Sequence, residues 1–151
     1  MLISDLLSPE RIRCDVHSSS KKRLLEIISK ELARNSDGLD QREIFESLCA
    51  REHLGSTGLG GGVAIPHGRV SGTDDVEALF LRLPKALPFD ADDGKPVDLL
   101  FALTVPEKCT EDHTRLLSSI AERFSDQELL GQIRDAADAN EIWQVLSSPH
   151  S

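Results

Sequence analysis

The stretch Gly55-Ser-Thr-Gly-Leu-Gly-Gly-Gly62, followed at once by Val63-Ala-Ile-Pro-His67-Gly68, differs from every other part of the chain. Five of its first eight residues are glycine, a composition that permits tight turns and the close approach of other segments. Backbone N–H groups that no side chain covers can also bind an anion, so the run suggests a phosphate-binding loop. The alternative is structural, with the glycines allowing a turn between a helix and a strand.

The surroundings of the glycine run argue against a nucleotide site. No Lys-Ser or Lys-Thr pair follows it, as a P-loop requires, and it leads into the apolar residues Val63-Ala-Ile instead of opening a helix. Both contexts that would support a nucleotide motif are therefore missing, and no cofactor is expected.

His67 gives the glycine run a chemical reading. It stands between Pro66, which stiffens the chain, and Gly68, which lets another segment come close. We expect it at the end of a short apolar strand. Neutral imidazole has a nucleophilic nitrogen at cellular pH, so covalent catalysis through His67 is chemically reasonable. A phosphorylated imidazole would carry about two negative charges, which need donors held ready around it.

Two further residues are candidates for that role. Arg51 precedes the glycine run at the end of an expected helix, and a guanidinium matches phosphoryl oxygens. His113, at the start of a later helix, could orient His67 or donate to a phosphoryl oxygen. The alternative is that both are ordinary surface side chains with no role in a site. We interpret the remaining histidines, His17, His53 and His150, in the same way.

A metal site is not indicated. His53, His67 and His113 lack the i, i+4 spacing of a helical histidine pair, and no carboxylate or thiolate stands at a recognisable ligand spacing. The three cysteines, Cys14, Cys49 and Cys109, form no C-x-x-C pair. We expect them to be reduced, mostly buried thiols.

Length and charge restrict the class of protein. The 151 residues correspond to one ordinary domain, with a hydrophobic core of normal size. The net charge of -9 argues against nucleic acid or an anionic membrane as a direct partner. No apolar run approaches the ~20 residues that cross a bilayer. The first seven residues lack a basic stretch, so we expect no secretory signal and a cytoplasmic location.

Hydrophobic spacing predicts helices in both halves of the chain. In the first half, one helix follows the hydroxyls of Ser18–Ser20 and ends at Asn35–Gly38, and a second begins at Asp40 and ends near His53 or Leu54. In the second half, helical spacing resumes at Thr110 and continues through Leu129–Ile133 and Ile142–Leu146, with Ser125 or Asp126 as the cap of the middle helix.

Two strands are expected between these helices, over Val76–Leu83 and Val97–Val105, and the segment Pro84–Pro96 reads as a surface loop. In the second strand, Val97, Leu99, Phe101, Leu103 and Val105 share one side, and Leu100 and Ala102 lie on the other. Apolar residues on both sides indicate a sheet covered by helices on both faces. The fold class is therefore α/β.

The stretch Arg51–Arg69 resembles the active-site signature of the IIA proteins of the bacterial phosphoenolpyruvate-dependent phosphotransferase system, in their fructose/mannitol superfamily. The nitrogen-regulatory branch is the most similar. The likeness continues through Pro88–Pro106 and the helix with His113, and the opening Ile3–Leu7 also suits that branch. It implies a single IIA domain (type 2) over residues 1–151, an α/β sandwich with a mixed central sheet.

The resemblance assigns roles to three residues. His67 would accept a phosphoryl group through Nε2 from a histidine phosphocarrier of the HPr type. Arg51 matches the family's active-site arginine, which stabilises phosphoryl charge, and His113 matches its second active-site histidine. Thr114 stands where the family usually has an apolar residue.

The resemblance also leaves the biological output open among three hypotheses. The first is a phosphorylated regulator linked to nitrogen or potassium, acting on targets such as potassium transport proteins or sensor kinases. The second is a sugar-specific IIA component that feeds a fructose- or mannitol-type transporter, although the chain shows no transport domain. The third is a binding module whose contacts do not require phosphate.

Overall fold

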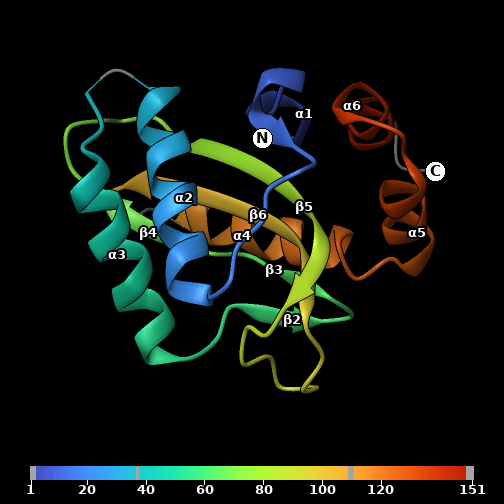
Figure 1. Cartoon of the computed structure of the whole chain (residues 1–151). Coiled ribbons are helices and arrows are strands. Elements are labelled where there is room, and N and C mark those ends of the chain that lie inside the picture. Colours follow the sequence, from blue (N-terminus) through green and yellow to red (C-terminus); the bar gives the residue numbers. More distant parts are fainter. Residues whose placement is uncertain (1–2, 37, 109–110, 149–151) are drawn as a thin grey trace.

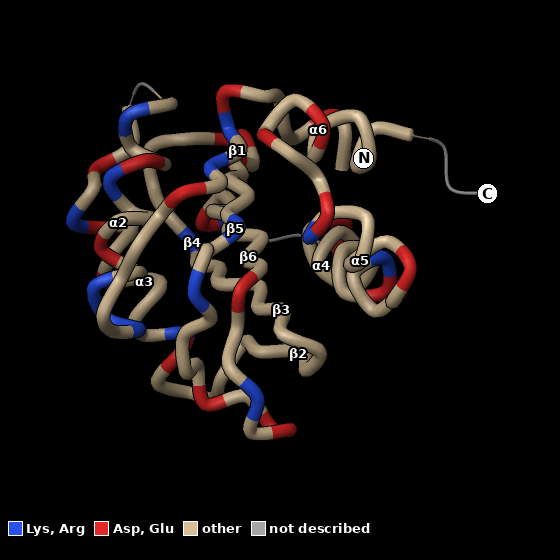
Figure 2. The backbone as a smooth tube through the Cα atoms, turned by 45° about the vertical axis from the view of Figure 1, so that its right-hand side comes forward, with Lys and Arg blue, Asp and Glu red and all other residues tan. Residues whose placement is uncertain are grey.

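Two long antiparallel strands, β5 (Glu77–Leu87) and β6 (Val97–Pro106), form the centre of the molecule in this computed structural model, which describes residues 3–36, 38–108 and 111–148. Their register places Phe80 opposite Phe101. Residues of β6 are buried on both faces, because helices cover each side of the sheet. Figure 2 shows the sheet between α2 and α3 on one side and α4 and α5 on the other.

Short strands complete a mixed six-stranded sheet with the order β1-β5-β6-β3-β2. They are β1 (Ile12–Arg13), β2 (Gly58–Gly60), β3 (Val63–Ala64) and β4 (His67–Val70). The first pairs with β5 in parallel, and β2 pairs with β3 in antiparallel fashion. Both β3 and β4 run parallel to β6, one after the other along the same edge. The mixed sheet confirms the expected α/β class.

The helices of the first half cover one face of the sheet (Figure 1). They are α2 (Lys21–Arg34) and α3 (Gln41–Leu54). Each begins where a side-chain oxygen accepts from a backbone N–H of the first turn, Ser20 from Arg23 and Asp40 from Glu43. The start and end of both predicted helices are thus confirmed.

The remaining helices cover the opposite face, in one core cluster with the Phe80 side of the sheet. They are α1 (Ile3–Leu6), α4 (Glu111–Arg123), α5 (Gln127–Asp135) and α6 (Ala139–Ser147). Of the two candidate caps for the middle helix, Asp126 is the one that accepts, from the N–H groups of Glu128 and Leu129. A 3-10 turn over Pro9–Arg11 leads from α1 into β1.

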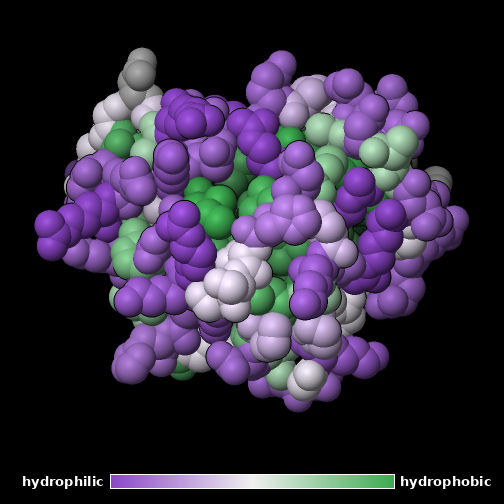
Figure 3. Space-filling model, viewed as in Figure 1, coloured by the Kyte–Doolittle hydropathy of each residue, from purple (hydrophilic) through white to green (hydrophobic). Residues whose placement is uncertain are grey.

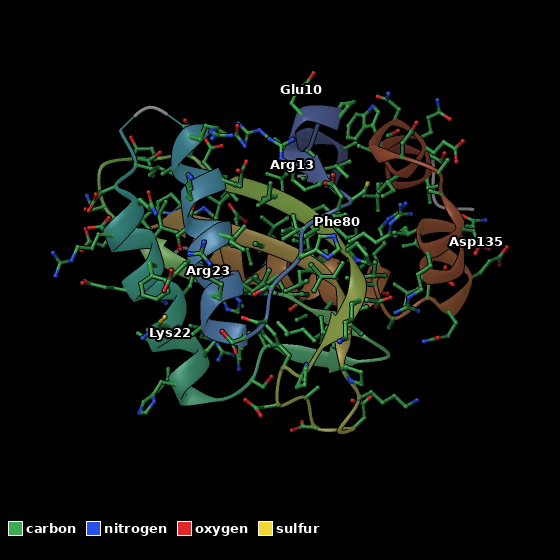
Figure 4. The ribbon with its side chains drawn as sticks, viewed as in Figure 1. Glu10, Arg13, Lys22, Arg23, Phe80 and Asp135 are labelled. Carbon is green, nitrogen blue, oxygen red and sulfur yellow. The ribbon has the colours of Figure 1, made fainter. Side chains whose placement is uncertain are left out.

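Three aromatic rings tie the α4 layer to the sheet. The rings of Phe80 and Phe124 are stacked with centroids 5.8 Å apart, and Phe101 lies 5.7 Å from Phe124. Figure 4 shows Phe80 inside the molecule, whereas Lys22 and Arg23 lie on the surface of α2. The face in Figure 3 is correspondingly hydrophilic over most of its area, with hydrophobic residues visible mainly near its centre.

Three expectations about the strands need correction. Strand β5 continues to Leu87, so the loop begins four residues later than Pro84. Val97 packs with the α2 and α3 cluster rather than with Leu99, because the pairing with β5 shifts register here and the regular alternation does not reach it. His67 begins β4 instead of ending a strand. The short strand β1 and helix α1 were not predicted at all.

The thiols also differ from expectation. Cys14 and Cys49 are free and half-buried rather than mostly buried, and burial raises the pKa of both, which keeps them protonated. Cys109 lies outside the described residues, as does His150. His17 and His53 are exposed, as expected. In the part of the chain that the structure describes, no helix is long and apolar enough to span a membrane.

Candidate functional site

An open cleft of about 260 Å³ lies where the end of α3, the start of β2, the β3–β4 edge and α4 meet. Its walls carry hydroxyl groups and apolar side chains beside one imidazole and one guanidinium. The lining residues are Arg51, Ser56, Thr57, Gly58, Leu59, Ile65, His67, Leu117, Ser118 and Ala121. Two of the three predicted site residues, Arg51 and His67, therefore face the same cleft.

His67 owes its place to a break in the sheet. Residues Ile65 and Pro66 interrupt the edge between β3 and β4, and proline has no N–H to contribute to a ladder. The carbonyl of Pro66 still accepts from the N–H of Leu103, at 3.0 Å, so the break is held against β6. His67 follows as the first residue of β4, paired with Leu103.

A hydrogen bond fixes the tautomer of the His67 ring. Its Nδ1 lies 2.7 Å from the carbonyl oxygen of Ile65. A carbonyl oxygen can only accept, so Nδ1 carries the proton in this contact and the neutral ring keeps its lone pair on Nε2. The arrangement thus selects Nε2 as the nucleophilic nitrogen.

The surroundings keep His67 neutral. Burial is the main cause and lowers the pKa of the ring below its usual 6.5. The hydrogen bond to Ile65 acts in the opposite direction, Arg51 lowers the pKa further, and Glu52 raises it. The net lowering means that the unprotonated form dominates at pH 7.

Arg51 lies in the last turn of α3 and reaches back to the chain that leaves the helix. Its Nη1 donates to the carbonyl oxygen of Gly55 at 2.9 Å. This bond holds one end of the guanidinium at the cleft. The other N–H groups of the same planar guanidinium can still donate hydrogen bonds.

His113 lies in the first turn of α4, half-buried. Residues four and eight positions later on the same helix face, Leu117 and Ala121, line the cleft. His113 itself is not among the residues that line the cleft, and it lies one helical turn before Leu117. Thr114 is exposed, which explains why a polar residue is tolerated there.

The glycine run is a turn, and its amide groups are largely engaged within the protein. Gly60, at the end of β2, and Gly61 and Gly62, between β2 and β3, adopt positive φ values of 90°, 67° and 85°. The N–H of Gly61 donates to Asp93, and the N–H of Gly58 to the Ser56 hydroxyl. Of the two readings, the structural one accounts for these glycines better than a phosphate-binding loop does.

Gly68 has the role expected of it. A Cβ atom built at this position would collide with the side chain of Ser47 on α3. The Ser47 hydroxyl donates to the carbonyl oxygen of Arg69 at 2.8 Å, so α3 packs directly on β4. This close contact brings the helix that carries Arg51 against the strand that carries His67.

Sequence reasoning missed part of the cleft. Ser56 and Thr57 were seen only as members of the glycine-rich run, and Leu117, Ser118 and Ala121 only as residues of a helix. Their common cleft depends on how α4 crosses the sheet edge, which no spacing in the chain reveals. Among the described residues, no group of three or more His, Cys, Asp or Glu side chains could hold a metal ion.

Comparisons with known proteins place this arrangement in context. Residues 5–148 match the model of the family described as "Phosphoenolpyruvate-dependent sugar phosphotransferase system, EIIA 2". The chain is 42% identical to a nitrogen regulatory protein of Klebsiella oxytoca over 151 residues (99% of this chain, 92% of the relative). It is 44% identical to one from Pseudomonas aeruginosa over 144 residues (95% and 94%). The crystal structure of the nitrogen regulatory protein IIA-Ntr of Neisseria meningitidis superposes with a TM-score of 0.89 at 43% identity, covering 96% of this chain and 99% of that one.

Proposed function

Because the chain belongs to the EIIA 2 family of the phosphoenolpyruvate-dependent sugar phosphotransferase system, we propose that it is a phosphotransferase component that accepts a phosphoryl group on His67. The donor is a histidine phosphocarrier protein of the HPr type, and residues 1–151 act as one domain. The hydrogen bond from Nδ1 to the Ile65 carbonyl is the observation that carries this proposal. It leaves Nε2 of a neutral ring, at the wall of an open cleft, to act as the nucleophile.

The transfer exchanges one N–P bond for another. The lone pair of His67 Nε2 attacks the phosphorus atom, and the N–P bond of the carrier breaks with its electron pair returning to the carrier's imidazole. Nδ1 of His67 keeps its proton throughout, bound to Ile65. Such a transfer requires positioning and charge stabilisation rather than covalent work by other residues.

Two residues would supply the charge stabilisation. Arg51 lines the same cleft, and its guanidinium offers N–H donors to the phosphoryl oxygens. His113 would donate to the phosphoryl group or orient the His67 ring from α4. The net charge of -9 would favour encounter with a phosphocarrier that presents basic residues. Acidic residues are spread along much of the backbone, including the loop after β5 (Figure 2).

We further propose that the protein has a regulatory role and acts in the cytoplasm. The relatives described above carry the name nitrogen regulatory protein. A phosphorylated and an unphosphorylated form would then bind target proteins differently, since the phosphoryl group adds about two negative charges at the cleft.

Incubation of the protein with phosphoenolpyruvate, enzyme I and the phosphocarrier tests the proposal. We expect one acid-labile phosphate on the intact protein, detected by mass spectrometry. The variant His67→Ala should remain unlabelled, and the matched variant His53→Ala, which removes an exposed histidine of α3, should label like the wild type. Absence of label, or equal label on His67→Ala, would refute it.

The other two hypotheses make different predictions. Transfer of the phosphoryl group onward to a sugar-specific IIB domain would favour the transport role. Equal capture of partner proteins by the wild type and by His67→Ala, with and without phosphorylation, would favour a binding module that does not use phosphate. If the regulatory proposal is correct, phosphorylation should change the capture of partner proteins by the wild type, and it should not change their capture by His67→Ala.

A further inference from the structure

A buried carboxylate lies directly beside the candidate site and has no part in the transfer described above. Glu52 follows Arg51 in the last turn of α3, and only 6% of its side chain is exposed. Its two carboxylate oxygens lie 3.3 and 3.2 Å from the backbone nitrogen of Thr57, which donates to them, and the Thr57 hydroxyl also donates to Oε1. Thr57 lines the cleft, so this carboxylate fastens a cleft wall to the helix that carries Arg51.

Lys21 supplies the positive charge that this carboxylate needs. Its Nζ lies 2.8 Å from Glu52 Oε2 and 4.4 Å from the centre of the Phe89 ring. It also donates to the carbonyl oxygen of Phe89 at 3.4 Å, and the Ser56 hydroxyl donates to the same oxygen at 2.7 Å. The first turn of α2, the end of α3 and the loop after β5 thus meet at one ion pair.

We propose that Glu52 is a positioning residue of the phosphoryl site, which holds Thr57 against α3 and places a fixed negative charge next to His67. The inference rests on the proposed function. The negative charge of Glu52 is balanced by Lys21 of α2. The neighbouring Arg51 guanidinium donates to the Gly55 carbonyl instead.

The charges around His67 make this role measurable. From α3, Arg51 and Glu52 act on the ring in opposite directions, and Glu52 raises the pKa of His67 against the lowering by burial. The elements packed around the ring carry further charged and titratable groups, among them His113 on α4 and the exposed Arg69 on β4 itself, but Arg51 and Glu52 are the charges that shift its pKa. Removal of the Glu52 charge alone should therefore move the His67 pKa further down.

Glu52→Gln keeps the size and the acceptor oxygen of the side chain and removes the charge. We expect the His67 titration midpoint, followed by NMR of the imidazole resonances, to fall below that of the wild type. The rate of phosphoryl transfer from the phosphocarrier should fall about 10- to 100-fold, because a small misplacement of the cleft wall is costly. Glu46→Gln on the same helix, whose side chain is 66% exposed, should change neither quantity.

Lys21→Met is the second variant, and it leaves the carboxylate without its counter-charge. Here the His67 midpoint should rise, the opposite of the change in Glu52→Gln, and general loosening of the fold cannot produce opposite shifts. The proposal would be overturned if the His67 midpoint moved in the same direction in both variants, or if it moved in neither variant. A slower transfer with an unchanged titration would overturn it too, because the role would then be structural only.

The titration also distinguishes a failure of the proposed function from a failure of the role of Glu52. If wild-type His67 accepts no phosphoryl group while the two midpoints shift in opposite directions, the proposed function fails and the placement of the Glu52 charge stands. If the wild type is phosphorylated and the midpoints do not shift, the role of Glu52 fails and the proposed function stands.

Discussion

The Nδ1 atom of His67 lies 2.7 Å from the carbonyl oxygen of Ile65, two residues earlier in the chain. A turn this tight is possible because Pro66 between them belongs to neither β3 nor β4. The chain therefore sets the tautomer of the ring locally, before any partner binds.

His67 should titrate below its value in the unfolded chain. Burial lowers its pKa from the usual 6.5, so at pH 7 the ring is neutral and transfer should show little dependence on pH. As the pH falls through the lowered pKa, Nε2 takes a proton and the rate should fall. NMR titration of the ring in the native protein and in urea measures both midpoints, and a native midpoint above that in urea would contradict the prediction.

The same shift makes stability depend on pH. Between the two midpoints the unfolded chain binds more protons than the native protein, so the free energy of unfolding rises with pH in this window. The contribution is fully present above the unfolded pKa and is lost as the pH falls through the folded pKa. The free energy of unfolding, measured with urea at several pH values across the window, should rise less steeply with pH for His67→Gln than for the wild type. Equal dependence on pH in the two proteins would count against burial as the cause.

Arg51→Lys should slow phosphoryl transfer by about 100-fold or more, because an ammonium cannot present a planar fork of donors. The bond to the Gly55 carbonyl would also be weakened. Transfer from labelled phosphocarrier under single-turnover conditions gives the rate. Arg42→Lys, on the same helix with its side chain 85% exposed, serves as the control and should match the wild type.

Gly62→Ala should destabilise the turn before β3. Gly62 has a φ of 85°, and an added Cβ would lie 2.5 Å from Arg134 Nη2 and 2.9 Å from Asp98 Oδ1. The backbone strain alone costs about 1–2 kcal/mol, and the bidentate contact between Arg134 and Asp98 would have to move. Urea unfolding should therefore show a lower free energy of unfolding than the wild type.

Gly131→Ala provides the matched comparison with the opposite sign. Gly131 lies within α5, and a Cβ at this position would meet nothing within 4 Å. Alanine should stabilise the helix by about 0.5–1 kcal/mol, because it loses less backbone freedom on folding. If Gly62→Ala were as stable as the wild type or more stable, the assignment of strain to Gly62 would be wrong.

Strong local signals made most of the fold predictable. Ser20, Asp40 and Asp126 cap helices at the expected positions, since a capping side chain acts within three residues of itself. The central strands were visible from their apolar runs. Strand β1 was not, because two residues carry no periodicity, and its existence depends on pairing with Phe80 and Leu81 of β5.

The candidate site was predictable in its residues and not in its geometry. The setting of His67 between Pro66 and Gly68 marked it as a candidate, and Arg51 was found by its place before the glycine run. The role of the glycines depends on which acceptors their N–H groups find, and Asp93, which binds Gly61, lies 32 residues away in sequence. Glu52 and Lys21 are also far apart in sequence, so only the fold brings these charges together.

Locating the phosphoryl group on the His67 ring tests most directly whether Nε2 is the nucleophile. Protein labelled with ¹⁵N at histidine is phosphorylated by enzyme I and the phosphocarrier, and long-range ¹H–¹⁵N correlation then assigns each ring nitrogen. We predict an N–P bond at Nε2, with Nδ1 still protonated and bonded to Ile65. Phosphorylation at Nδ1, or an unmodified His67 in a protein labelled elsewhere, would contradict phosphoryl transfer to His67 Nε2.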